Sequence, residues 1–174
     1  MQLQFTLVSA LLASVATAYP VRDEPHTSRR DVDASLFKRA TPGSVNCGPD
    51  GAYDVSWVQS AFDDMQKYVN VDGSLRPSAG SRTYPLRNQA RDPDVATALD
   101  GIAGCETGQA NMVYWEFPLT SDGWNGGPEQ SQGPDRVIGI GQSPGQGGTW
   151  ALTYCLSVTH RGQANNDNVP CADA

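Results

Sequence analysis

The sequence of 174 residues contains few basic side chains and only two histidines. Its 12 Lys and Arg are outnumbered by 19 Asp and Glu, so the formal net charge is −7 at pH 7. A protein that coats or stores nucleic acid neutralises many phosphates with basic side chains, and this composition argues against such a role. The composition remains compatible with an enzyme that must release a polyanionic substrate.

The sequence also lacks the patterns of a metal site and of a membrane protein. The spacings of the four cysteines do not resemble a zinc site, and His and Cys do not cluster. The apolar run from Phe5 to Val15 is too short to span a bilayer comfortably, and no later segment comes close. We therefore expect no metal ion, no other cofactor and no membrane partner.

The N-terminal region has the pattern of a secreted precursor. Residues 1–18 resemble a signal peptide, because an apolar core is followed by the small-residue cleavage signal Ala16-Thr17-Ala18. Residues 19–39 are polar and end in the dibasic pair Lys38-Arg39, which is typical of a pro-segment removed late in secretion. The alternative is that this segment remains attached as a tail. We expect a secreted, extracellular protein whose mature domain comprises residues 40–174.

Cleavage after Arg39 would make His160 the only histidine, because His26 leaves with the leader. The mature part then carries seven basic and fifteen acidic side chains, a net charge of −8. Its length is that of one domain with a modest core.

The four cysteines all lie in the mature part, and secretion takes them to an oxidising compartment. Four cysteines allow three pairings. We predict a Cys47–Cys171 bridge that ties the two ends together and a Cys105–Cys155 bridge in the middle. On the chain-entropy model, closing a loop of over a hundred residues constrains the unfolded chain by roughly 4–5 kcal/mol.

The first regular element expected is a helix that begins after Asp54, its N-cap, and ends before Gly73 and Pro77. Its apolar residues recur at helical spacing: Val55, Val58, Ala61, Phe62, Met65 and Val69. From there to Ala110 the chain is rich in Gly, Pro, Arg and Asp, with one extended candidate at 83–87.

Strands are expected at 111–119, 137–140 and 150–159. In the first of these, alternation places Glu116 on one face and Trp115 and Phe117 on the other. A helix followed by successive strands predicts an α+β fold, in which one N-terminal helix packs on a twisted antiparallel β-sheet. We expect the opposite face of the sheet, which carries Glu116, to be open for a substrate.

Three charged side chains lie in or beside these apolar runs: Glu116, Arg136 and His160. A base, a phosphate clamp and an acid are what a metal-free enzyme needs to cleave RNA. Each residue also has an ordinary structural interpretation. Glu116 could be a solvated strand residue, Arg136 could pair with Asp135 or another carboxylate, and His160 could be a surface residue at a strand end.

Taken together, these segments resemble the secreted guanyl-specific ribonucleases of fungi, distant relatives of barnase in the microbial ribonuclease superfamily. The resemblance covers almost the whole mature region, and the distance from His160 to Cys171 fits the family without a gap. The residues that carry it are Cys47, Asp54-Val55-Ser56, Gln59, Ala61, Thr83-Tyr84-Pro85, Tyr114 to Leu119, Gly127-Pro128, Pro134 to Val137, Thr159 to Gly162, Val169 and Cys171.

The resemblance implies a monomer with the microbial ribonuclease fold that cleaves single-stranded RNA by transesterification to a 2′,3′-cyclic phosphate. Glu116 would be the general base for the ribose 2′-hydroxyl, and His160 the general acid for the 5′-leaving oxygen. Arg136 would stabilise charge on the phosphoryl oxygens, and the Tyr84 hydroxyl would donate a further hydrogen bond. Acid and base catalysis each contribute on the order of 10²–10⁴-fold, and a positioned cation adds roughly 10²–10³-fold.

The chain departs from the family at the second histidine, which Leu86 replaces. That histidine assists the base and touches the phosphate, so its loss predicts a weaker or altered enzyme. Arg87 or Arg82 could partly supply the missing charge, but neither acts as a base near neutral pH. Near the end of the sequence, Asn168 replaces an expected aromatic residue.

The guanine-reading loop departs too, because residues 88–92 lack the family's aromatic residues. Stacking on such residues contributes roughly 1–3 kcal/mol per base in nucleic-acid binders. Asp92 could still accept hydrogen bonds from guanine, with Asn166 helping to hold the base and Asn88 in the same loop. The loss of stacking therefore argues against a strong preference for guanine.

Two other classes of function are compatible with the sequence. One is a catalytically weak or inactive ribonuclease-fold effector that binds host RNA or protein, which the Leu86 and loop changes favour. A ribotoxin-like enzyme is a narrower variant, and the low count of basic residues argues against it. The other class is a sugar hydrolase with Glu116 and an Asp as its carboxylate pair, but alternation provides no second carboxylate on the Glu116 face.

Overall fold

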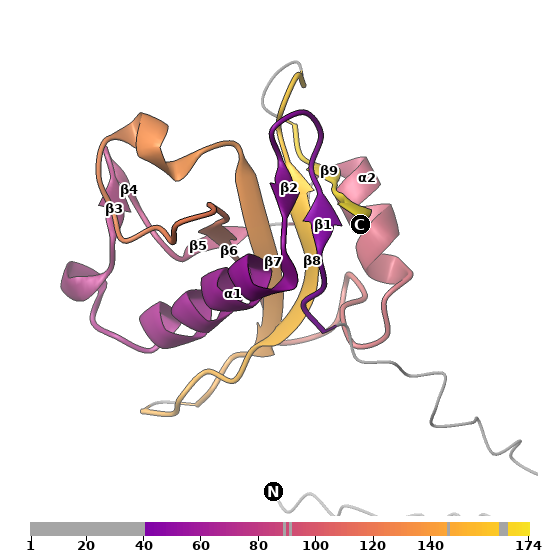
Figure 1. The fold of residues 1–174 in the computed structure, drawn as a ribbon. Coiled ribbons are helices and arrows are strands. Elements are labelled where there is room, and N and C mark those ends of the chain that lie inside the picture. The colour runs from indigo at the N-terminus through magenta and orange to yellow at the C-terminus, as the bar shows by residue number, and fades with distance from the viewer. Residues whose placement is uncertain (1–40, 89, 91, 146, 164–166) are drawn as a thin grey trace, which may run out of the picture. The chain divides into compact units, whose positions relative to one another are not determined.

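The computed structural model describes residues 41–88, 90, 92–145, 147–163 and 167–174. The centre of this part of the chain is a five-stranded antiparallel sheet with the strand order β5-β6-β7-β8-β9 (Figure 1). The strands are β5 (Leu86–Asn88), β6 (Met112–Pro118), β7 (Asp135–Gln142), β8 (Thr153–Thr159) and β9 (Val169–Pro170). Two helices in the described residues, α1 and α2, pack against it, so the fold is mixed α+β, as predicted.

Smaller elements complete the fold. A three-stranded sheet with the order β10-β1-β2 brings together the first and last described segments. A two-stranded sheet, β3 and β4, precedes β5. The elements are β1 (Val45–Asn46), β2 (Ala52–Tyr53), β3 (Ser78–Ala79), β4 (Arg82–Thr83), β10 (Ala172–Asp173) and the 3-10 turns η2 (Gly73–Leu75) and η3 (Glu129–Gln132).

Helix α1 (Val55–Val69) has the residues predicted from its apolar spacing. Its buried side chains are Val58, Ala61, Met65 and Val69. They belong to a core cluster that also contains the sheet residues Trp115, Phe117, Val137 and Tyr154. Asp54 occupies the N-cap position, but its side chain makes no capping hydrogen bond, and the helix ends at the C-cap Asn70, before Gly73.

The predicted strands 111–119, 137–140 and 150–159 correspond to β6, β7 and β8, and β7 is longer than predicted at both ends. The extended candidate at 83–87 is instead divided between β4 and β5. The interruption is Tyr84-Pro85, which is joined by a cis peptide bond.

A second helix, α2 (Pro93–Asp100), forms in the stretch that was expected to be irregular. Its buried residues Val95 and Leu99 belong to a second core cluster on the sheet face opposite α1. The sheet residues of that cluster are Tyr114, Ile138, Ile140, Leu156 and Val158. The expectation that this face is open for a substrate is therefore wrong over the part that α2 covers, because the face is apolar there and requires a covering layer.

Both disulfide pairings are confirmed. Cys47–Cys171 closes a separation of 124 residues and lies beside the β10-β1-β2 sheet. Cys105–Cys155 joins the turn after α2 to β8 and closes a separation of 50 residues. Since its two sulfurs are part of the second core cluster, this bridge holds the α2 region on the sheet.

None of the helices in the described residues is long and apolar enough to cross a membrane.

Candidate active site

Glu116 lies on β6, on the sheet face opposite α1, as alternation predicted. In the strand register its neighbours are Leu86 on β5 and Ile138 on β7. The side chain is half-buried, and its Oε2 accepts a hydrogen bond of 2.6 Å from Nδ2 of Asn88. This carboxylate therefore has apolar neighbours across both adjacent strands and a defined amide donor.

Arg136 lies on β7, two residues from Ile138, and alternation places it on the same face as Glu116. It is only 2 % exposed. Its Nη2 donates to the Tyr84 hydroxyl at 3.3 Å, and its guanidinium lies 5.5 Å from the centre of that ring. Its Nη1 donates at 2.7–3.2 Å to the carbonyl oxygens of Gln132, Gly133 and Asp135.

Tyr84 is fully buried, and its hydroxyl donates to Oε1 of Gln132 while accepting from Arg136. Its ring packs edge-on against Phe117 and Trp124. The prediction that this hydroxyl donates to the substrate is therefore not met here, because the core encloses the group and its proton already has an acceptor. Tyr84 instead supports the guanidinium of Arg136.

His160 directly follows β8 and is half-buried, and its backbone N–H donates to the carbonyl oxygen of Pro134 at 3.3 Å. Burial lowers the pKa of its imidazole from the usual value of 6.5, and the positive charge of Arg136 lowers it further. In the strand register Arg136 is opposite Val158, two residues before His160. Smaller effects come from Asp135, which acts in the opposite direction, and from Arg82 and Arg161.

Asp135 pairs with Arg161, and this is the only salt bridge among the described residues. The interpretation in which Arg136 pairs with the Asp135 carboxylate is therefore wrong. The Asp135 carboxylate faces the α1 side, where Tyr53 also lies, whereas Arg136 points to the other face. Within the described part of the chain, Arg136 is thus a buried cation with no carboxylate within 4 Å.

The Asp135 carboxylate is fully buried and accepts three close donors. Arg161 contacts it with Nη2 at 2.6 Å and with Nε at 3.1–3.2 Å, and the Tyr53 hydroxyl donates to it at 2.6 Å. Burial, followed by the hydrogen bond to Asp135, raises the pKa of Tyr53 to about 12. Arg161 also donates to the carbonyl oxygens of Pro49 and Asp50.

Because Arg161 directly follows His160 in the chain, this network anchors the end of β8 from which the histidine projects. This role of Arg161 was not predicted from the sequence. Its only sequence signal is the position beside His160.

The residues predicted to read the base are engaged elsewhere. Asp92 is the N-cap residue of α2, and its Oδ2 accepts hydrogen bonds from the backbone N–H and the side-chain amide of Asn168, at 3.2 and 3.0 Å. Asn88 donates to Glu116, as described above. Asn166 lies outside the described residues, so its predicted role stays a prediction.

Arg87 is exposed, and its guanidinium lies 5.5 Å from the centre of the Trp115 ring. Since Trp115 belongs to the core cluster under α1, this contact turns Arg87 away from the face of Glu116. This orientation does not favour Arg87 as the residue that partly supplies the charge of the missing histidine, and the same role for Arg82 stays a prediction. Arg87 is opposite Trp115 in the strand register, whereas its neighbour Leu86 is opposite Glu116. Neighbouring residues of a strand point to opposite faces of the sheet.

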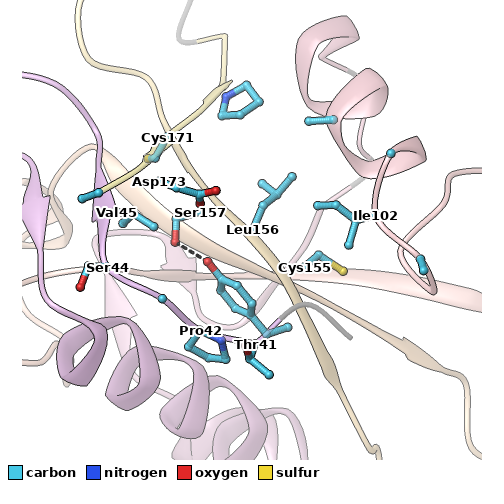
Figure 2. Close-up of a pocket in the computed structure, with 17 residues that line it drawn as sticks. Thr41, Pro42, Ser44, Val45, Ile102, Cys155, Leu156, Ser157, Cys171 and Asp173 are labelled. Carbon is cyan, nitrogen blue, oxygen red and sulfur yellow. Dashed lines mark hydrogen bonds between the residues drawn. The ribbon is translucent and has the colours of Figure 1, made fainter. Parts of the chain in front are cut away.

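A cavity of about 630 Å³, shown in Figure 2, has none of these residues in its lining. It is bounded by residues 41–45, the end of α2, β8 and the C-terminal residues, and the Tyr154 and Ser157 hydroxyls meet in it at 3.1 Å. A smaller cavity of about 380 Å³ reaches the candidate site only through Asn88. The candidate active site is therefore identified by its charged side chains, because none of Glu116, Arg136 and His160 lines either cavity.

No group of three His, Cys, Asp or Glu side chains in the described residues is arranged to hold a metal ion. Comparison of the sequence with models of protein families and with curated proteins, and of the structure with solved structures, finds no significant match.

Proposed function

We propose that the mature domain is a secreted endoribonuclease that cleaves single-stranded RNA by transesterification to a 2′,3′-cyclic phosphate. The proposal is supported by the motif resemblance in the sequence and by the location of the three charged residues. Glu116 and Arg136 share one face of the sheet, and His160 follows the strand beside Arg136.

The observation that carries the proposal is the unpaired positive charge of Arg136. A buried charge without a counter-ion is costly, and proteins normally pair such charges or neutralise them. Here the carbonyl oxygens of the preceding turn and the Tyr84 hydroxyl hold the guanidinium, but no carboxylate in the described residues neutralises it. A phosphoryl group bound next to Arg136 would supply the missing negative charge.

The reaction balances with the residues present. Glu116 removes the proton of the ribose 2′-hydroxyl, and the 2′-oxygen forms a bond to phosphorus. The bond between phosphorus and the 5′-oxygen breaks, and protonated His160 transfers its proton to that oxygen. Arg136 stabilises the negative charge that develops on the phosphoryl oxygens. A bound phosphate also favours protonation of His160, which offsets the lowered pKa of the free imidazole.

The experiment measures the turnover of GpC, ApC, UpC and CpC by the protein purified from the medium of a secreting host. We expect a 2′,3′-cyclic phosphate product and a loss of roughly 10²–10⁴-fold in kcat for both Glu116→Gln and His160→Gln. The matched control is Glu129→Gln, an exposed carboxylate at η3, which should keep full activity. Turnover that survives both active-site substitutions would mean that the activity comes from elsewhere.

The same assay reports base preference. Because Asp92 is hydrogen-bonded to Asn168, we expect only a small preference for GpC over the other dinucleotides.

A second candidate is a ribonuclease-fold effector that binds host RNA or protein without turnover. The observation that favours it is the packing of α2 on the sheet face that a substrate would use. The absence of turnover above the two active-site variants, in a folded protein, would select this candidate.

A further inference from the structure

Among the described residues, one side chain, that of Asn88, donates a hydrogen bond to the carboxylate of Glu116. Asn88 lies diagonally across the β5–β6 pair, where Leu86 is directly opposite Glu116 and Asn88 is opposite Tyr114. The distance from Nδ2 of Asn88 to Oε2 of Glu116 is 2.6 Å. This short contact is a charge-assisted hydrogen bond when the carboxylate is ionised.

A second contact determines which way the amide of Asn88 points. Its Oδ1 accepts a hydrogen bond of 2.6 Å from the backbone N–H of Ala90. A side-chain amide has one acceptor atom and one donor atom. Because a backbone donor occupies the oxygen, the nitrogen must face Glu116. The turn that follows β5 thus presents a donor, and not an acceptor, to the carboxylate.

The other groups around Glu116 do not perform this task. Its neighbours across β5 and β7, Leu86 and Ile138, are apolar. On its own strand, the Tyr114 hydroxyl donates to the carbonyl oxygens of Cys105 and Glu106. Other titratable or charged groups around this face are Arg136 on β7, His160 after β8, the α2 carboxylates Asp92, Asp94 and Asp100, and Glu106 near Tyr114.

We propose that Asn88 is a positioning residue, which holds the carboxylate of Glu116 in the orientation of a proton acceptor. The inference rests on the proposed function of Glu116 as the general base. Asn88 holds the Glu116 carboxylate from the diagonal position on β5, because Leu86 occupies the position directly opposite Glu116. Since an amide does not titrate, the support for the base persists into acidic conditions.

The decisive variant is Asn88→Asp. It has the same shape and keeps an oxygen for the Ala90 N–H, but it replaces the donor to Glu116 by a second carboxylate. Like charges in one site disfavour ionisation of the pair. We expect the acidic limb of the pH profile of kcat/KM to move up by about one unit or more, with a loss of about tenfold at pH values below that limb and recovery above it. The alkaline limb, which belongs to His160, should stay in place.

Asn125→Asp is the matched control, because it adds the same charge at an exposed asparagine outside the site. Asn88→Ser removes the donor without adding a charge, and it should lower kcat more than it changes KM. An acidic limb that is unchanged in Asn88→Asp, or that moves equally in Asn125→Asp, would overturn the proposal.

A titration that needs no turnover separates this inference from the proposed function. The sequence contains only Glu106, Glu116 and Glu129 after residue 40, so carbon-13 labelling of glutamate gives few carboxyl signals, and Glu116→Gln assigns the relevant one. We expect the midpoint of the Glu116 signal to rise by about one pH unit in Asn88→Asp and to rise less in Asn88→Ser. Unchanged midpoints overturn the role of Asn88, whereas shifted midpoints in a protein without Glu116-dependent turnover overturn the proposed function alone.

Discussion

The buried pair of Asp135 and Arg161 allows a stability prediction worked directly from the geometry. Arg161→Met keeps much of the length of the side chain but removes the guanidinium. The Asp135 carboxylate, which is fully buried, is then left with the Tyr53 hydroxyl at 2.6 Å as its remaining side-chain donor among the described residues. Removing one partner of a buried ion pair costs about 3–5 kcal/mol. Tyr53→Phe deletes one hydrogen bond to a charged group and should cost about 1.5–3 kcal/mol.

Urea unfolding at pH 6, followed by tryptophan fluorescence, measures both losses as a lower midpoint with an unchanged slope. Arg82→Met is the control, because Arg82 is exposed and its loss should change the free energy of unfolding by less than about 0.5 kcal/mol. In the double variant Asp135→Asn, Arg161→Met the buried charge is absent. The double variant should therefore lose less free energy of unfolding than Asp135→Asn and Arg161→Met lose in sum as single variants.

The raised pKa of Tyr53 adds a pH dependence with a defined sign. The unfolded tyrosine loses its proton near pH 10, whereas the folded Tyr53, with a pKa of about 12, keeps it. The contribution of Tyr53 to the free energy of unfolding is therefore fully present below pH 10. Between pH 10 and pH 12 it falls by about 1.4 kcal/mol per pH unit. Tyr53→Phe should show a smaller fall, because the contributions of the other tyrosines with a raised pKa, Tyr114 and Tyr154, remain. An Arg161→Met variant as stable as the Arg82→Met control, or a Tyr53→Phe variant with the wild-type alkaline fall, would refute the assignment of a buried ionic network.

Three further outcomes are expected. Because the pKa of His160 lies below 6.5, kcat/KM should decline as the pH rises through that lower value, and a decline that begins above pH 7 would contradict His160 as the acid in the free enzyme. Replacing Cys105 and Cys155 together by serine should lower the free energy of unfolding by roughly 4 kcal/mol for a separation of 50 residues, as denaturant titration would measure. Gly139→Ala should cost about 1–3 kcal/mol in the same titration, because a Cβ at this site would lie 2.6 Å from Cε of Met65; a cost near zero would show that this side chain moves aside easily.

The local sequence pattern was sufficient to predict the helix that buries one stripe of side chains and the strand that buries one face. Apolar residues at helical spacing predicted the bounds of α1, and strict alternation predicted that Glu116 lies opposite Trp115 and Phe117. Both patterns record which side chains leave water, and that property is periodic along the chain. The disulfide pairing was one of three possibilities, and the structure agrees with the one chosen.

Helix α2 was beyond this kind of reasoning. It has eight residues, and its two buried side chains, Val95 and Leu99, give only one helical interval in a stretch with many Gly, Pro and Asp residues. Its stability comes from packing on β8 and β9 and from the nearby disulfide, and neither contact can be seen in a local sequence pattern.

The environment of the candidate site depended on tertiary structure as well. The donor to Glu116 comes from Asn88, 28 residues away, and the partner of Asp135 is Arg161, 26 residues further on, and not a neighbour in the chain. Hydrogen bonds of this kind depend on strand register, because a shift by one residue turns every side chain to the opposite face. The sequence by itself therefore singled out the candidate residues Glu116, Arg136 and His160. Only the tertiary structure decided which side chains form hydrogen bonds with one another, because these contacts depend on strand register and packing.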